Sequence, residues 1–199
     1  MRLHGPRIFW IWGDRCGKRA QKNGRHTAGI GARRLLQVSR VHPEDRVAAL
    51  AGNPNVGKST VFNALTGSRQ HTGNWSGKTV ACAEGRLRGG GLTLTDLPGT
   101  YSLRAHSEEE RAAREFLVSG QACAVVLVAD AGCLERSLIL ALQVLEVQKN
   151  AVLCLNLMDE AAKKGIEIDA AALERELGIP VIPCAARQGK GLHELEARY

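Results

Sequence analysis

The chain has 199 residues, of which 44% are hydrophobic and 24% charged, so it is long enough for one α/β domain with a buried core and an appendage. Its formal net charge of +7 is concentrated at one end, because residues 1–46 hold 11 Lys/Arg against 3 Asp/Glu while residues 47–199 hold 16 against 17. The near-neutral remainder argues against a basic nucleic-acid-binding domain, and no apolar run reaches the roughly 18–20 residues of a membrane-spanning helix.

The first 45 residues are rich in Gly, Arg and His and show no sustained helical or strand period. We predict a basic, disordered N-terminal extension at 1–45, followed by one globular domain at 46–199. The extension either has no function or contacts acidic lipid or RNA. The apolar run at residues 7–12 is too short for a secretory signal and lacks a cleavage site, so the cytoplasm is the expected compartment.

From residue 46 onward, short apolar runs alternate with amphipathic segments, a pattern typical of parallel strands joined by crossover helices. Strands are predicted at 47–51, 79–88, 92–96, 122–129, 151–155 and 181–182, with 79–88 and 92–96 forming a hairpin through the three glycines at 89–91. Helices are predicted at 58–65, 108–118, 134–148, 170–177 and from 192 onward. The expected fold is α/β, with a mostly parallel six-stranded sheet, one antiparallel edge strand and helices on both faces.

Cysteine and histidine usage gives little sign of a metal or disulfide framework. The six cysteines form no CxxC pair and several lie in apolar runs, as buried reduced thiols do. The histidines are scattered along the chain, so we expect no metal site among them.

Residues 52–59, GNPNVGKS, fit the pattern GxxxxGK[ST] directly after a predicted strand and directly before a predicted helix. Gly52 and Gly57 would let the backbone wrap around phosphates at the helix N-terminus. Lys58 would bridge the β and γ phosphates, and Ser59 would bind Mg²⁺. The predicted phosphate-binding residues are Gly52, Asn53, Pro54, Asn55, Val56, Gly57, Lys58, Ser59 and Thr60. With this loop, the expected α/β fold is that of a P-loop NTPase. The loop alone does not distinguish ATP from GTP.

Three further motifs follow predicted strands, at the edge where open α/β sheets collect their ligands. Residues 96–99, DLPG, form a DxxG switch in which Asp96 faces Mg²⁺ through water and the Gly99 N–H meets a γ-phosphate. Residues 156–159, NLMD, correspond to NKxD. Asp159 would accept hydrogen bonds from guanine N1–H and the exocyclic amine, which adenine cannot supply, and Asn156 would tie this loop to the phosphate loop.

The base pocket is completed by residues 184–187, CAAR, at the place of an SAK loop. A backbone N–H there would meet guanine O6, with Ala186 as the expected donor beside Cys184 and Ala185. An ordinary helix cap by Asp159 is the alternative interpretation of NLMD.

Taken together, GNPNVGKSTVFNALTG, HTGNWSGKTV, DLPGTYSL, NLMDEAAKKGIEID and LGIPVIPCAARQGKGL resemble the ferrous iron transport protein B family, over residues 47–199. The resemblance implies a Ras-like G domain that binds GTP or GDP with Mg²⁺, and the departure from NKxD at Leu157 and Met158 is similar to that family's usual NMMD. It also implies that Thr79 is the switch I threonine, which joins the Mg²⁺ shell in the GTP state.

The resemblance also implies a potassium site. Asn55 matches the asparagine that helps to hold K⁺ against the phosphates in potassium-activated GTPases, and the switch I carbonyls of the site map onto Gly73 and Trp75. The residues expected to act in catalysis are therefore Lys58, Asn55, Thr79 and Gly99. Thr100 stands where Ras-type enzymes carry a glutamine that orients water, so we expect slow, K⁺-stimulated turnover.

The function expected from this resemblance is a GTPase switch coupled to a ferrous iron permease, at the inner face of the cell membrane. The resembled protein continues into a helical segment and a membrane part with the iron path, neither of which follows Tyr199, so this chain alone is not expected to transport iron. One alternative is an RNA- or ribosome-associated assembly GTPase of the Era/EngA type that uses the basic extension. Another is a nucleotide-binding module without useful turnover.

Overall fold

The computed structural model describes residues 45–67, 70–74, 81–104 and 106–198. Its strands are β1 (Arg46–Gly52), β2 (Gln70–Asn74), β3 (Ala81–Arg86), β4 (Leu92–Asp96), β5 (Ala124–Asp130), β6 (Ala151–Asn156) and β7 (Val181–Pro183). Its helices are α2 (Lys58–Thr66), α3 (Glu108–Val118), α4 (Leu134–Val147), α5 (Met158–Lys163), α6 (Ala170–Leu177) and α7 (Leu192–Glu196). Short 3₁₀ turns precede α4 (η1, Ala131–Cys133) and α7 (η2, Ala186–Gln188).

The described strands form one sheet in the order β2-β3-β4-β1-β5-β6-β7. The pairs β4-β1, β1-β5, β5-β6 and β6-β7 are parallel, whereas β3 runs antiparallel to both β4 and β2. The fold class is the one predicted, a mostly parallel sheet with one reversed strand. The sheet holds seven strands instead of six because β2, for which no strand was predicted, adds an edge beyond β3.

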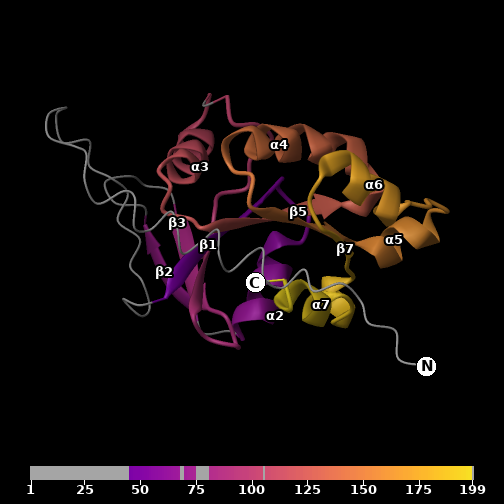
Figure 1. Ribbon diagram of the computed structural model, residues 1–199, viewed down its shortest axis with the longest axis horizontal. Helices are drawn as coiled ribbons and strands as arrows, with labels where there is room; N and C mark the ends of the chain where they lie inside the picture. The colour runs from indigo at the N-terminus through magenta and orange to yellow at the C-terminus, as the bar shows by residue number, and fades with distance from the viewer. Residues whose placement is uncertain (1–44, 68–69, 75–80, 105, 199) are drawn as a thin grey trace, which may run out of the picture.

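Helices cover both faces of the sheet (Figure 1), and each face has its own core. On the upper face of the view, Phe116 of α3 and Val144 of α4 pack against Leu127 and Leu153 of the central strands. On the lower face, Phe62 of α2 and Leu195 of α7 pack with a different set of strand side chains. Successive strand residues point to opposite faces, so β1 contributes alternately to the two cores and is buried from Val47 to Gly52.

The start of α3 shows why its sequence forms a helix where predicted. Ser107 has an extended backbone and its hydroxyl accepts a hydrogen bond from Glu110 N–H at 3.1 Å. Three glutamates then occupy the first turn, where negative charge is favourable at the positive end of the helix dipole. The apolar stripe of Ala112, Ala113, Phe116 and Leu117 faces the core.

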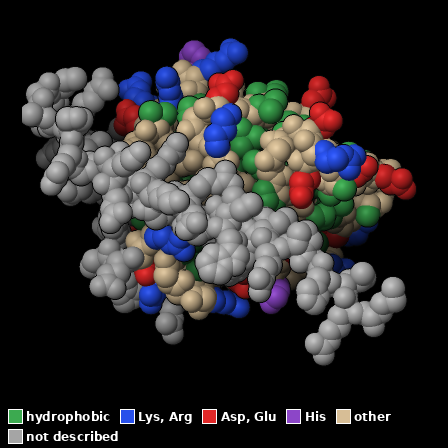
Figure 2. Space-filling view, viewed as in Figure 1, with side chains coloured by type: hydrophobic (Ala, Val, Ile, Leu, Met, Phe, Trp, Pro, Cys, Tyr) green, Lys and Arg blue, Asp and Glu red, His purple; other side chains and the backbone are tan. Residues whose placement is uncertain are grey.

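Within the described ranges, no helix is both long and apolar enough to cross a membrane. Blue Lys/Arg and red Asp/Glu side chains are interspersed over the described surface visible in Figure 2, and their numbers beyond residue 46 are nearly equal, at 16 and 17. The predicted extension lies outside the described residues except for Asp45, the last residue of its range. Asp45 is buried and forms an ion pair with Arg86 of β3 at 2.7 Å.

Candidate functional site

The phosphate loop connects the carboxyl end of β1 to the first residue of α2, as its sequence predicts. Asn55 and Gly57 both have left-handed backbone conformations, with φ of 66° and 81°. This reversal turns the chain so that α2 begins at Lys58, with Ser59 and Thr60 exposed in its first turn. Backbone N–H groups at a helix N-terminus have no partner within the helix, so the loop suits an anion.

Glycine is required at both fixed positions of this loop. A Cβ on Gly52 would lie 2.6 Å from the Val128 carbonyl oxygen of the neighbouring strand, and one on Gly57 would lie 2.5 Å from Asn156 Nδ2. Both distances are shorter than any real Cβ contact. The loop therefore fits between β5 and the loop after β6 only when these two side chains are absent.

Lys58 extends toward the end of β4, where its ammonium group pairs with the Asp96 carboxylate. Both side chains are largely buried, at 11% and 15% exposed. Burial raises the pKa of Asp96, and the Lys58 ammonium opposes that rise through its charge and its hydrogen bond. The pair places one cation and one anion at the mouth of the phosphate loop.

The DxxG segment lies against the phosphate loop, as its position after a strand predicted. Leu97 N–H donates to Leu50 O at 2.9 Å, and Thr100 N–H donates to Gly52 O at 3.3 Å. A Cβ on Gly99 would lie 3.2 Å from Pro54 Cα, so the two loops touch at this glycine. Thr100 itself is buried.

Helix α4 contacts both the phosphate loop and the DxxG segment through residues that belong to no motif. The Arg136 guanidinium lies 4.1 Å from the centroid of the Tyr101 ring, and its carbonyl oxygen accepts a hydrogen bond from Asn53 Nδ2 at 3.3 Å. Gln143 Oε1 accepts from Leu103 N–H at 2.7 Å. Arg136 lies on α4, 48 residues before the CAAR loop, and belongs to no motif, so no sequence pattern indicated its position.

Asn156, at the end of β6, is the residue that joins the phosphate loop to the base loops. Its side-chain Nδ2 donates to Val56 O at 3.0 Å, while its Oδ1 accepts from Ala186 N–H at 3.1 Å. The side chain is 1% exposed, so water does not compete for these bonds. The predicted tie to the phosphate loop is present, and the same amide also holds the CAAR segment.

The CAAR segment contributes main-chain groups to the site, because its small side chains are buried. Cys184, Ala185 and Ala186 are all less than 10% exposed. Cys184 lies beside Cys154, and the hydrogen bond between the two thiols raises the pKa of Cys154 and lowers that of Cys184. Ala186 N–H, the expected donor to guanine O6, hydrogen-bonds to Asn156 in this structure.

Asp159 is the second residue of α5, a helix that begins directly after Leu157, whose backbone is left-handed with φ of 63°. Met158 N–H donates to Cys184 O at 3.1 Å, which holds the start of α5 against the CAAR loop. Asp159 Oδ2 accepts a hydrogen bond from Gln188 Nε2 at 2.9 Å. Gln188 follows directly after CAAR, within the stretch LGIPVIPCAARQGKGL, but the sequence pattern assigned it no role.

The remaining predicted residues concern the metal ions. Thr79 and Trp75 lie outside the described residues, and Gly73 lies on β2, opposite Cys82 of β3. Across the described part of the chain, no three His, Cys, Asp or Glu side chains form a group able to hold a metal. A hydroxyl from Ser59 and one carboxylate from Asp96 nevertheless fit Mg²⁺, which typically takes one or two protein ligands and completes its shell with phosphate and water.

Comparison with known proteins agrees with this geometry. A model of the family "Ferrous iron transport protein B" matches residues 46–199. The chain belongs to this family. The Fe(2+) transporter FeoB of Escherichia coli strain K12 is 46% identical over 153 residues, which cover 74% of this chain but 20% of the transporter. The chain therefore spans about a fifth of the length of the curated family members it matches.

Solved structures of the FeoB family share the fold. The G domain of the T. maritima FeoB iron transporter superposes with a TM-score of 0.71 at 46% identity, covering 77% of this chain and 95% of that one. An S. thermophilus FeoB variant bound to mGDP gives 0.74 at 35% identity, covering 77% and 60%. The T. maritima cytosolic domain in its GMPPNP form gives 0.73 at 46%, covering 77% and 62%. These matches give no support to the Era/EngA alternative.

Proposed function

We propose that this chain is a guanine-nucleotide switch that binds GTP and GDP with Mg²⁺ and hydrolyses GTP. The observation that carries the proposal is the buried amide of Asn156, which is hydrogen-bonded to the phosphate loop on one side and to the CAAR loop on the other. One nucleotide could then lie with its phosphates against residues 52–60 and its base between Asp159 and the CAAR loop. The relatives solved with mGDP and GMPPNP support this assignment.

At the phosphate end, the residues of this chain would act mainly by charge and position. Lys58 would leave its pairing with Asp96 to contact the β and γ phosphates, and the backbone N–H of Gly99 would contact the γ-phosphate. Ser59 and Asp96, with Thr79 of switch I, would hold Mg²⁺. When bound, that ion would neutralise charge on the phosphate oxygens.

Turnover is proposed to be slow and stimulated by potassium. Thr100 has no side-chain amide with which to orient attacking water, and its N–H is already bonded to Gly52. Asn55 is exposed on the loop, where it could share a K⁺ ion with carbonyls of Gly73 and Trp75. Faster phosphate release in KCl than in NaCl is the expected result, and no release in either salt would contradict the GTPase assignment.

The family supports a cytoplasmic role beside the permease of a ferrous iron transporter. The permease would be the partner, attached to or associated with this domain at the inner face of the membrane. Residues 1–45 are proposed to remain a separate basic extension of the domain at 46–199.

Nucleotide selectivity tests the guanine assignment directly. The wild-type chain should bind GDP far more tightly than ADP. Asp159→Asn should weaken GDP binding roughly 100-fold, because two charge-assisted hydrogen bonds of roughly 1.5–3 kcal/mol each are replaced by at most one neutral one. Xanthosine diphosphate should gain affinity, since the new amide can donate to its C2 carbonyl. Titration calorimetry with the three nucleotides measures this, and equal wild-type affinity for GDP and ADP would rule out the proposal.

A further inference from the structure

The carboxylate of Asp159 receives a side-chain hydrogen bond whose donor lies in the opposite base loop. Gln188 Nε2 lies 2.9 Å from Asp159 Oδ2. Because a carboxylate only accepts hydrogen bonds, the amide nitrogen and not its oxygen must face it. The contact joins residues 29 positions apart, one from each of the two segments assigned to the base.

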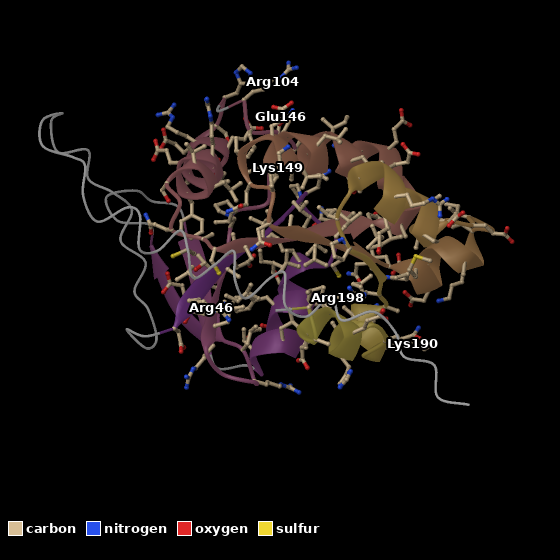
Figure 3. All side chains as sticks on the ribbon, in the orientation of Figure 1. Arg46, Arg104, Glu146, Lys149, Lys190 and Arg198 are labelled. Carbon is tan, nitrogen blue, oxygen red and sulfur yellow. The ribbon has the colours of Figure 1, made fainter. Side chains whose placement is uncertain are left out.

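Gln188 is held in place by its own backbone. Its N–H donates to Ala185 O at 2.8 Å as the last residue of η2, and Gly189 follows with φ of 72°. Ala185 and Lys190 then close the loop with reciprocal hydrogen bonds of 3.1 and 3.3 Å. Lys190, labelled beside α7 in Figure 3, marks where this loop ends. The amide of Gln188 is therefore presented from a closed turn.

The chemistry of guanine recognition makes the orientation of this carboxylate important. Guanine offers two parallel donors, N1–H and the 2-amino group, and each needs one carboxylate oxygen in the same plane. The terminal torsion of an aspartate is broad, so a half-buried residue such as Asp159 gains a defined carboxylate plane from a hydrogen bond. Oδ2 has a second lone pair, so it can accept from Gln188 and from guanine together.

We propose that Gln188 is a positioning residue for guanine specificity. It fixes the plane of the Asp159 carboxylate so that both oxygens meet the base at once. This inference rests on the proposed guanine-binding function. It names a residue that sets how much the 2-amino group contributes to the affinity for guanine nucleotides. It predicts a loss of discrimination between nucleotides, not a loss of folding.

Gln188→Ala tests the proposal through the ratio of two affinities, for GDP and for inosine diphosphate, which keeps N1–H but lacks the 2-amino group. GDP should bind about fivefold more weakly, the size expected for the loss of one ordinary hydrogen bond. Inosine diphosphate needs only one oxygen, so its affinity should fall by about twofold or less. Gln188→Glu should weaken GDP binding further, because a second carboxylate would face Asp159.

Gln121→Ala is the matched control, since it removes the same side chain between α3 and β5, at the opposite ends of the strands. Gln121→Ala should leave the affinities for GDP and inosine diphosphate unchanged. The two glutamine-to-alanine variants should shift the thermal unfolding of the nucleotide-free protein equally. An unchanged or increased GDP affinity in Gln188→Ala, or an equal loss for both nucleotides, would overturn the inference. Either result would leave the wild-type preference for GDP over ADP intact, so failure of the guanine assignment is detected separately.

Discussion

The phosphate loop and the two base loops lie at the same edge of the sheet but are held by different groups. At the phosphate end, glycines at 52 and 57 let the backbone pass close to a neighbouring strand and to Asn156. At the base end, the loops are held together by the buried Asn156 amide and by main-chain hydrogen bonds of Cys184 and Ala186. A site built by glycine geometry leaves a strict sequence pattern, whereas one built by main-chain contacts tolerates many side chains.

The sharpest way to break this comparison is Gly57→Ala, which alters a point where the two ends touch. Alanine at φ of 81° costs about 1–2 kcal/mol, and its Cβ would displace Asn156 Nδ2, which lies 2.5 Å away. We expect GDP affinity to fall roughly 100-fold or more, corresponding to about 3 kcal/mol. Calorimetric titration measures the loss.

Gly178→Ala is the control for backbone strain alone. Gly178 has φ of 66°, and nothing lies within 4 Å of its added Cβ. Alanine there should lower stability by about 1 kcal/mol without changing GDP affinity. If Gly57→Ala behaved in the same way, contact between the two loops would not matter for binding.

Asn156→Ala should have the next largest effect, and it separates stability from binding. It leaves the Val56 carbonyl and the Ala186 N–H buried without their partner, so the free energy of unfolding should fall by about 2–3 kcal/mol. GDP affinity should fall as well, since neither loop is then held. Chemical denaturation and nucleotide titration together test both effects.

Asn150→Ala is matched to that variant, because Asn150 Nδ2 donates to Cys123 O at 2.6 Å at the other end of β6. It should lower stability while leaving GDP affinity at the wild-type value. Equal affinity losses in the two asparagine variants would show that the effect of Asn156 is one of general stability.

Ser107→Ala should have the smallest effect and none on the site. It removes the hydroxyl that caps α3, which typically costs about 1 kcal/mol of stability. Helix α3 packs on one core of the sheet through Phe116 and supplies no residue to the phosphate loop or to the two base loops. Thermal unfolding should therefore shift while GDP binding does not. A change in affinity would mean that α3 influences the site after all.

The same contrast explains how much could be predicted from the sequence. The phosphate loop and the DxxG segment lie where their motifs predicted, because this glycine spacing directly after an apolar strand is specific to few structures. β2 was not predicted because residues 70–74, QHTGN, lack alternating apolar residues and contain a glycine. α5 has only six residues, too few to show a helical period.

At the base end, the pattern predicted which residues gather but not how they bond. The role of Asn156 as a tie followed from its motif, whereas its second bond, to Ala186, depends on how two loops meet in space. Gln188 and Arg136 reach the site through tertiary contacts alone. Such contacts join residues far apart in the chain and leave no local signature.

The backbone strain at Leu157 and Asn55 arises when the chain folds, before any nucleotide binds. Among the described residues, only Leu157 and Asn55 have positive φ without being glycine, and such a backbone in an L-residue costs about 1–2 kcal/mol. The residue after each bend is hydrogen-bonded within the protein, Met158 N–H to Cys184 O and Val56 O to the Asn156 amide. An arriving nucleotide therefore finds both bends already made, and more of its interaction energy remains available as affinity.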